Sequence, residues 1–406
     1  MRGPPYLFKS LLGLVLLVAA PLAAHAQASD AAFVADTILQ IPGGPHVVVL
    51  QGDPGGVAAL RLSIPLVESA AEAGAGRMLA VLAERRMVGA ARRIGARVSA
   101  SRTPWGLAYS VEGAEVDLDY LMYLLRLATA EPRPESGVVE AIRAEFIVDL
   151  ERRAESPGDR ILADLRRAAA PELVPLAGSL GSVALLNEAQ LRAVWRRTHR
   201  SPSMSLVAMT STSATALLSM LEAIGLPDGM VADPPDTSDT GAERVGPLPL
   251  RSWYGEARVD HSVADPHAAV AAHLIAQNAA EVGPGFELGV RLWQLRDRTL
   301  LVVAGAAVSR QSGPSLSDAV HTLLVDVNAS LDPRRVAVAV DRVGLEYRTR
   351  AGTPGGLVEQ VGRMADSTGG SSDALQYLAS LARVTVESLA AYLDGLAAPV
   401  AARLLP

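Results

Sequence analysis

Apolar and polar positions follow clear periods along most of the chain, and these periods predict its secondary structure. The segment 57–67, "VAALRLSIPLV", is almost continuously apolar and predicts a buried strand. The segment 76–87 that follows carries the apolar content of one to two helical turns. For the first half of the chain the pattern predicts strands at 57–67, 106–113 and 204–211, and helices at 76–87, 118–129, 136–154, 159–169, 188–198 and 214–224.

The second half runs in the same order, with a strand, helices, a strand and a helical run before a short closing strand. A repeat of about 190 residues indicates a duplicated domain, because solenoid repeats have periods of about 20 to 50 residues. Each half is therefore predicted to be a sheet covered on one face by helices, which is an α+β fold. The predicted strands are 255–263, 300–309 and 398–405, and the predicted helices are 268–281, 286–298, 316–331, 332–348, 357–366, 372–381 and 385–396.

The segment 226–250 has no apolar period and is rich in Pro, Gly, Asp and Thr. This composition predicts an interdomain linker. The domain organisation that follows is an N-terminal domain at 27–227, a linker at 228–250 and a C-terminal domain at 251–406.

The first 26 residues have the pattern of a secretory signal peptide. Positive charges at Arg2 and Lys9 precede an apolar run at 11–20, and the small-x-small sequence at 24–26 predicts cleavage near Ala26. The apolar run is too short to span a bilayer comfortably, and no other segment is apolar enough, so no stable membrane anchor is predicted. We therefore expect an exported protein, periplasmic or secreted.

Composition removes several classes of function. The formal net charge of −6 and the 4% aromatic content argue against a nucleic-acid partner. Lys9 is the only lysine, so the mature chain lacks the lysine of P-loops, kinases, Ser-x-x-Lys acylases and Schiff-base enzymes. The absence of cysteine means that no disulfide contributes to stability.

The order of the elements and several local strings resemble the pitrilysin/insulinase family of inverted-zincin metallopeptidases, which includes the mitochondrial processing peptidase subunits. The resemblance implies two homologous halves, each a mainly antiparallel sheet covered by helices, in the LuxS/processing-peptidase-like arrangement. The strings that carry it are "PGGPHVVVL" (42–50), "GAGRMLAVL" (74–82), "GARVSASRTPWGLAYSV" (95–111), "DLERRAESP" (149–157), the segment 178–211, and "RLWQLRDRTLLVVAG" (291–305), taken as an Arg-containing helix and the strand after it.

Active members of this family carry an H-x-x-E-H zinc motif on one helix and a third ligand, usually glutamate, on another. In this sequence the first histidine falls on Arg77, the glutamate on Ala80, the second histidine on Val81, and the third ligand on Asp149. Arginine offers no lone pair, and alanine and valine can neither bind a metal nor accept a proton. The resemblance therefore implies a chain with no catalytic residues and no zinc cofactor.

Two further positions are implied to contact substrate. Arg296 matches an arginine that in this family touches the substrate backbone, although Val303 replaces its tyrosine partner seven residues later. Ser99 and Ala100 stand where the family's substrate-facing strand carries Asn-Ala. Such an edge binds an extended peptide through its main chain, so the binding does not require the original side chains.

These observations favour a non-catalytic subunit that pairs with a zinc-bearing paralogue as a heterodimer and helps to enclose a peptide substrate. One alternative is a stand-alone or homodimeric peptide-binding module. Another is a hydrolase with an unrelated site at Ser179 in "AGSLG", although a glycine loop is the simpler interpretation of this string. His261, His267 and His273 lack helical i, i+4 spacing and are interpreted as scattered histidines.

Overall fold

The computed structural model describes residues 35–135, 137–229, 252–260, 265–279, 286–296, 298–307, 313–368, 372–396 and 399–405. None of the helices in these segments is both long and apolar enough to cross a membrane. The predicted signal peptide, all but two residues of the predicted linker, and His261 lie outside the described residues. The proposed domain limits at 227 and 251 accordingly stay predictions.

The first sheet contains six strands in the order β1-β2-β6-β3-β5-β4. All neighbouring strands are antiparallel except β2 and β6, which are parallel. The sheet is therefore mainly antiparallel, as the family resemblance implies. Its strands are β1 (Ala35–Gln40), β2 (His46–Gln51), β3 (Val57–Pro65), β4 (Arg97–Arg102), β5 (Gly106–Ala114) and β6 (Ser205–Thr210).

The second sheet contains four antiparallel strands in the order β10-β7-β9-β8. This order matches β6-β3-β5-β4 of the first sheet, strand for strand, and in both sheets a helix follows the second strand of the series. The duplicated α+β arrangement predicted from the sequence is thus confirmed. The strands are β7 (Trp253–Asp260), β8 (Phe286–Gln294), β9 (Thr299–Ala307) and β10 (Ala401–Leu405).

Most predicted helices are present with limits close to those expected. The helices of the first half are α2 (Ala75–Ala91), α3 (Leu118–Thr129), α4 (Val138–Glu155), α5 (Pro157–Ala169), α6 (Leu180–Leu185), α7 (Glu188–Thr198) and α8 (Ala214–Ile224). Those of the second half are α9 (Pro266–Ala279), α10 (Gly313–Ala329), α11 (Pro333–Arg350), α12 (Pro354–Thr368), α13 (Ser372–Leu381) and α14 (Val386–Gly395).

The helix predicted at 286–298 is wrong, because these residues form strand β8 and the start of a hairpin turn. Side chains along β8 alternate between half-buried and exposed, which is the two-residue period of a strand. The apolar residues Leu288, Leu292 and Leu295 also fit a helical spacing, and this second fit misled the prediction. Strands β1, β2 and β4 were likewise not predicted from the periodicity.

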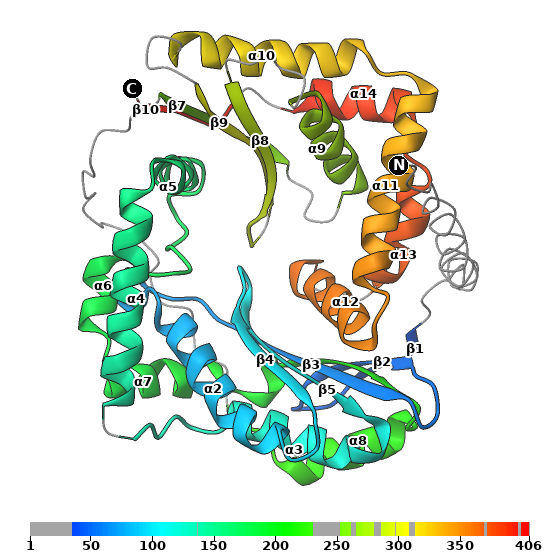
Figure 1. The fold of residues 1–406 in the computed structure, drawn as a ribbon. Coiled ribbons are helices and arrows are strands. Elements are labelled where there is room, and N and C mark those ends of the chain that lie inside the picture. Colours follow the sequence, from blue (N-terminus) through cyan, green and yellow to red (C-terminus); the bar gives the residue numbers. More distant parts are fainter. Residues whose placement is uncertain are drawn as a thin grey trace, which may run out of the picture. The chain divides into compact units, whose positions relative to one another are not determined.

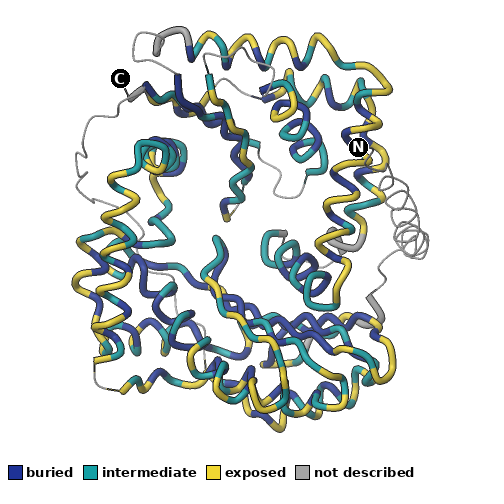
Figure 2. Tube along the Cα trace, in the orientation of Figure 1, coloured by how far each residue is buried: buried dark blue, intermediate teal, exposed yellow. Residues whose placement is uncertain are grey.

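Each sheet buries one face against its own helices. In the first half, Leu60, Leu62 and Ile64 of β3 belong to one large core with residues of α2, α3 and α7. In the second half, Leu301 and Val303 of β9 pack with residues of α9, α10 and α11. Figure 2 shows the central strands of the first sheet as buried and the outer helices as alternating between buried and exposed residues.

The opposite face of each sheet receives a helix from the other half of the chain (Figure 1). Helix α5 packs against β7 and β10 of the second sheet, and α12 packs against β3 and β6 of the first. These two helices occupy equivalent places in the duplicated order, so the exchange is reciprocal. The simple expectation that helices cover one face of each sheet is therefore incomplete.

Candidate functional site

The site predicted from the family resemblance begins at the N-terminus of α2. Glu68, which is 1% exposed, accepts a hydrogen bond from the backbone N–H of Gly76 at 2.7 Å and forms an ion pair with Arg102 at 3.0 Å. Gly76 allows the close approach, since a Cβ there would lie 2.7 Å from the Cδ atom of Arg102. These contacts fix the start of α2 against the β4–β5 hairpin.

Two of the four motif positions are in direct contact. The Nη2 atom of Arg77 on α2 lies 3.0 Å from Oδ2 of Asp149 on α4. The Arg77 guanidinium also lies over the ring of Phe146, with Cζ 4.0 Å from the ring centroid, which is a favourable cation–π geometry. Positions that bind one metal ion in active members of the family are thus joined here by an ion pair.

The remaining two motif positions supply no ligand. Ala80 is 2% exposed and belongs to the core, and Val81 on the same helix is half-buried. A zinc site requires at least three lone-pair donors, and Asp149 is the single donor in this set. The residues present therefore do not fit zinc, and within the described parts of the chain no group of three or more potential metal ligands is found.

Asp149 lies among arginines that favour its ionised form. Burial raises its pKa, but hydrogen bonds from Arg152 and Arg77 and the charge of Arg153 outweigh this effect, so the pKa of Asp149 is lowered. The Asp149 carboxylate lies 2.6 Å from Arg152 and 3.0 Å from Arg153. The three guanidinium groups therefore favour the ionised form of Asp149 and make it a weaker proton acceptor.

Ser99 and Ala100 lie on β4, the terminal strand of the first sheet as described. They pair with Ser110 and Tyr109 of β5 on one side only. Helix α2 packs beside this strand. The arrangement leaves the outer main-chain groups of β4 without a strand partner among the described residues, which is the geometry that strand addition requires.

Arg296 lies in the turn between β8 and β9 and not at the end of a helix. Its carbonyl oxygen accepts a hydrogen bond from the Trp105 indole at 3.2 Å, and this contact joins the β8–β9 turn to the β4–β5 hairpin. Its side chain is exposed, whereas Val303 is 1% exposed within the second core. Burial of Val303 in that core separates it from the surface on which Arg296 lies.

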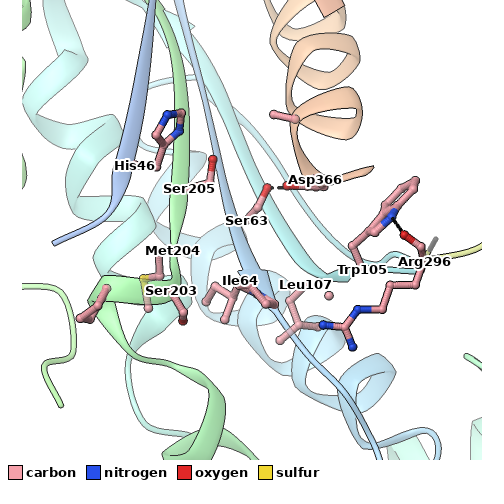
Figure 3. A pocket seen from close by; sticks show the side chains of 14 residues that line it. His46, Ser63, Ile64, Trp105, Leu107, Ser203, Met204, Ser205, Arg296 and Asp366 are labelled. Atoms are coloured by element: carbon pink, nitrogen blue, oxygen red, sulfur yellow. Dashed lines mark hydrogen bonds between the residues drawn. The ribbon is translucent and has the colours of Figure 1, made fainter. Parts of the chain in front are cut away.

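Arg296 lines a cavity of about 350 Å³ beneath the C-terminal end of α12 (Figure 3). Sequence reasoning did not find this cavity, because its walls come from the starts of β2, β5 and β6, the end of β3, and α12. Ser63 donates a hydrogen bond to Asp366 at 3.2 Å across one side of it. The other lining residues are His46, Ile64, Pro65, Trp105, Gly106, Leu107, Pro202, Ser203, Met204, Ser205 and Ala365.

Ser179 is the N-cap of α6. Its Oγ accepts the N–H of Ser182 at 3.1 Å and lies 3.1 Å from the Ser182 hydroxyl, so it closes a capping box. Among the described residues, the hydroxyl of Ser179 is hydrogen-bonded to Ser182 and not to a histidine. A helix does follow this serine directly, but the strand that a nucleophile elbow requires does not precede it.

The structure also brings together a serine, a histidine and an aspartate whose contact was not predicted. His267 at the start of α9 has Nδ1 2.6 Å from Asp265 and Nε2 3.0 Å from the Ser388 hydroxyl on α14. Ser388 is also the third residue of α14, where its Oγ accepts the N–H of Thr385 at 2.9 Å. The group therefore joins the N-termini of two helices. Its hydrogen bonds also run from aspartate to histidine to serine, as in a catalytic triad.

Comparison of the sequence with protein-family models and with curated proteins gives no match. Comparison of the structure with solved structures gives many matches. A protease from Helicobacter pylori has a TM-score of 0.74 at 11% identity, over 91% of this chain and 98% of that chain. A peptidase M16 inactive domain from Pseudomonas fluorescens has a TM-score of 0.74 at 13% identity, over 91% and 96%. The fold is that of the M16, or pitrilysin/insulinase, peptidases.

A chain of a larger complex also has a similar fold. A chain from complex III2 of Candida albicans has a TM-score of 0.70 at 11% identity, over 88% of this chain and 92% of that chain. The likeness extends over nearly all of each matched structure, so the described M16 fold covers both halves. At identities this low the comparison establishes the fold only. The function has to be inferred from the residues of the site.

Proposed function

We propose that the protein is an exported, non-catalytic member of the pitrilysin/insulinase family that pairs with a zinc-bearing paralogue. The observation that carries the proposal is the ion pair of Arg77 and Asp149. It joins two positions that hold zinc in active members, and it leaves a cation where the metal would be. A matched structure that is named an inactive M16 domain supports the same interpretation.

The features that remain suit contact with a peptide. The outer edge of β4 at Ser99 and Ala100 offers main-chain groups, and Arg296 presents an exposed guanidinium to the cavity near Trp105. In the proposed heterodimer the paralogue supplies zinc and this chain supplies wall and peptide contacts. The principal alternative is a homodimeric or stand-alone peptide-binding module that uses the same surfaces.

Co-expression with a paralogue that carries H-x-x-E-H, followed by size exclusion and peptide kinetics, tests the pairing. We expect co-elution at micromolar concentration and peptide cleavage by the pair. Arg296→Ala should lower kcat/KM about tenfold without dissociating the pair, because a charge-assisted hydrogen bond contributes roughly 1.5–3 kcal/mol. Arg192→Ala, which removes a half-buried arginine on α7 paired with Glu188, is the control for loss of an arginine away from the cavity.

Elution of two separate chains would reject the heterodimer. A homodimer that binds peptide alone would then favour the binding module. Elemental analysis of the purified protein is expected to show no stoichiometric zinc, and one zinc per chain after dialysis would contradict the proposal. The combined variant Arg77→His, Ala80→Glu, Val81→His and Asp149→Glu tests whether the helix geometry alone suffices for metal binding.

The contacts of His267 favour a second candidate function, hydrolysis of an ester or amide by Ser388. Against it, the backbone N–H of Ser388 is bonded to Thr385 Oγ1 at 3.2 Å and is not available to stabilise an oxyanion. A fluorophosphonate probe distinguishes the two candidates. Labelling that Ser388→Ala abolishes and Ser179→Ala does not would establish the hydrolase, and the absence of labelling would reject it.

A further inference from the structure

The surroundings of Asp149 carry more positive than negative charge. Arg77, Arg152 and Arg153 all contact this one carboxylate, and no other acid contacts these three guanidinium groups in the described structure. The side chains of Arg152 and Arg153 are 76% and 50% exposed, whereas that of Asp149 is 15% exposed. One carboxylate neutralises one of the three charges, so the cluster presents two positive charges toward solvent.

Arg77 also has an unused donor. Its Nη1 atom is buried and has no hydrogen-bond partner, although Nη2 is bonded to Asp149. A buried donor without a partner is destabilising. Phe146 beneath the guanidinium and Asp149 beside it hold the group in this orientation. One donor of a guanidinium held in a fixed orientation thus has no acceptor within the described structure.

We propose that the former zinc position binds a carboxylate of a peptide, with Arg77 as its central contact. Nη2 stays bonded to Asp149, so Arg77 offers the peptide carboxylate one charge-assisted hydrogen bond from Nη1, and Arg152 and Arg153 add charge at the rim. This inference rests on the proposed function, because it names the chemical group that the peptide presents. The carboxylate comes from the C-terminus of the peptide or from an acidic side chain.

Fluorescence anisotropy with the purified protein and three labelled peptides tests the inference. The first is an unstructured peptide without acidic residues that ends in a free carboxylate, the second is its C-terminal amide, and the third is the amide with one internal glutamate. We expect the first or third peptide to bind about tenfold more tightly than the second. Which of the two does so identifies the source of the carboxylate.

Variants of Arg77 and of Asp149, with opposite expected effects, make the test specific. Arg77→Gln should abolish the preference for the carboxylate, and Arg77→Lys should retain little of it because an ammonium lacks the planar guanidinium fork. Asp149→Asn should strengthen carboxylate binding several-fold, since it removes the internal competitor. Arg85→Gln is the matched control, because Arg85 also joins α2 to α4, through Glu145 at 3.6 Å. Circular dichroism confirms that each variant is folded.

Equal binding of all three peptides would overturn the carboxylate site and leave the proposed peptide-binding subunit intact. Weaker carboxylate binding by Asp149→Asn would also overturn it. If no peptide binds, the inference fails, while co-elution with the paralogue still reports separately on the pairing.

Discussion

Helices α5 and α12 occupy equivalent places in the two halves, yet they pack on the opposite sheet by different means. Ile161 and Leu165 of α5 form an apolar cluster with Leu300 and Val302 of β9. Helix α12 instead meets Arg61 of β3, which is 0% exposed, and offers it Glu359 at 2.9 Å and Asp366 at 2.8 Å. The α5 contact is an apolar cluster, whereas the α12 contact includes an ion network around a buried arginine.

The difference matters because only the polar contact borders the cavity. Asp366 is bonded to Arg61 and also lines the cavity beside Ser63 and Arg296. A buried ion network gains little over a well-packed apolar contact, but removing one member is costly and its geometry is directional. The ion network therefore fixes where α12 lies on the first sheet and also stabilises the contact. The apolar α5 contact, by contrast, tolerates changes of side-chain shape that conserve volume.

The largest predicted effect comes from breaking the ion network. Arg61→Ala leaves Asp366, which is 8% exposed, with an unpaired charge, and we expect the free energy of unfolding to fall by about 3–5 kcal/mol. Urea denaturation of the variant measures it. The double variant Arg61→Ala/Asp366→Ala should lose less than the sum of the two single variants. If the loss in the double variant equals the sum of the two single losses, Arg61 and Asp366 do not stabilise each other.

The apolar contact should be nearly as sensitive to truncation and far more tolerant of conservative replacement. Leu165→Ala removes buried methyl groups and should cost about 3 kcal/mol. Leu165→Met keeps most of the volume and should cost less than about 1.5 kcal/mol. Arg61→Lys, by contrast, should lose most of what Arg61→Ala loses, because one ammonium cannot reach Glu359, Asp366 and Ser63 together. Urea midpoints of the three variants test the contrast, and similar tolerance at both positions would refute it.

Sequence reasoning located most elements because their limits depend on local signals. The helix predicted at 188–198, for example, is α7, which begins directly after Asn187, whose side chain accepts the N–H of Gln190. The ion network was not predicted, because Arg61 and Glu359 are 298 residues apart. The sequence around an isolated arginine in an apolar strand does not indicate which acidic residue it pairs with.

The candidate site was predictable in part. The family resemblance placed Arg77 and Asp149 at ligand positions, but nothing in either string predicts that the two side chains form an ion pair. Strand β8 was missed because its apolar residues fit two periods. The cavity was missed because five separate elements form its walls.

The helix-covered side of the first sheet also buries a pair of neutral polar side chains, His199 and Tyr109. Burial and the nearby charge of Arg86 lower the pKa of His199 to about 3, and its Nε2 lies 3.0 Å from the Tyr109 hydroxyl. The unfolded histidine has a pKa near 6.5, so it takes up a proton first as the pH falls. The stability from neutral His199 is present above about pH 6.5, and about 2 kcal/mol of it is lost by pH 5.

Urea denaturation at pH 7 and pH 5 measures this loss. The variant His199→Gln should lose about 2 kcal/mol less than the unmodified protein over this interval, since it has no proton to take up. Ordinary carboxylates titrate mostly below this interval and contribute little to it. Equal losses in both proteins would mean that His199 is protonated in the folded state without penalty.

The smallest effect concerns how closely α12 approaches Arg61. Gly362 lies inside α12, where replacing glycine by alanine normally stabilises a helix by about 1 kcal/mol. At this position a Cβ would lie 2.5 Å from Nη1 and 2.7 Å from Cδ of Arg61, so the side chain must shift. We expect Gly362→Ala to destabilise the protein by about 1 kcal/mol, with the sign reversed from the usual effect.

Gly89 of α2 is the matched control, because a Cβ there would meet nothing within 4 Å. Gly89→Ala should stabilise the protein by up to about 1 kcal/mol. The decisive measurement introduces Gly362→Ala into the Arg61→Ala background, where the obstructing guanidinium is gone. There the alanine should become stabilising, and a change of sign between the two backgrounds would assign the cost to the Arg61 contact. If Gly362→Ala has the same effect in both, the glycine does not serve the approach of α12 to the first sheet.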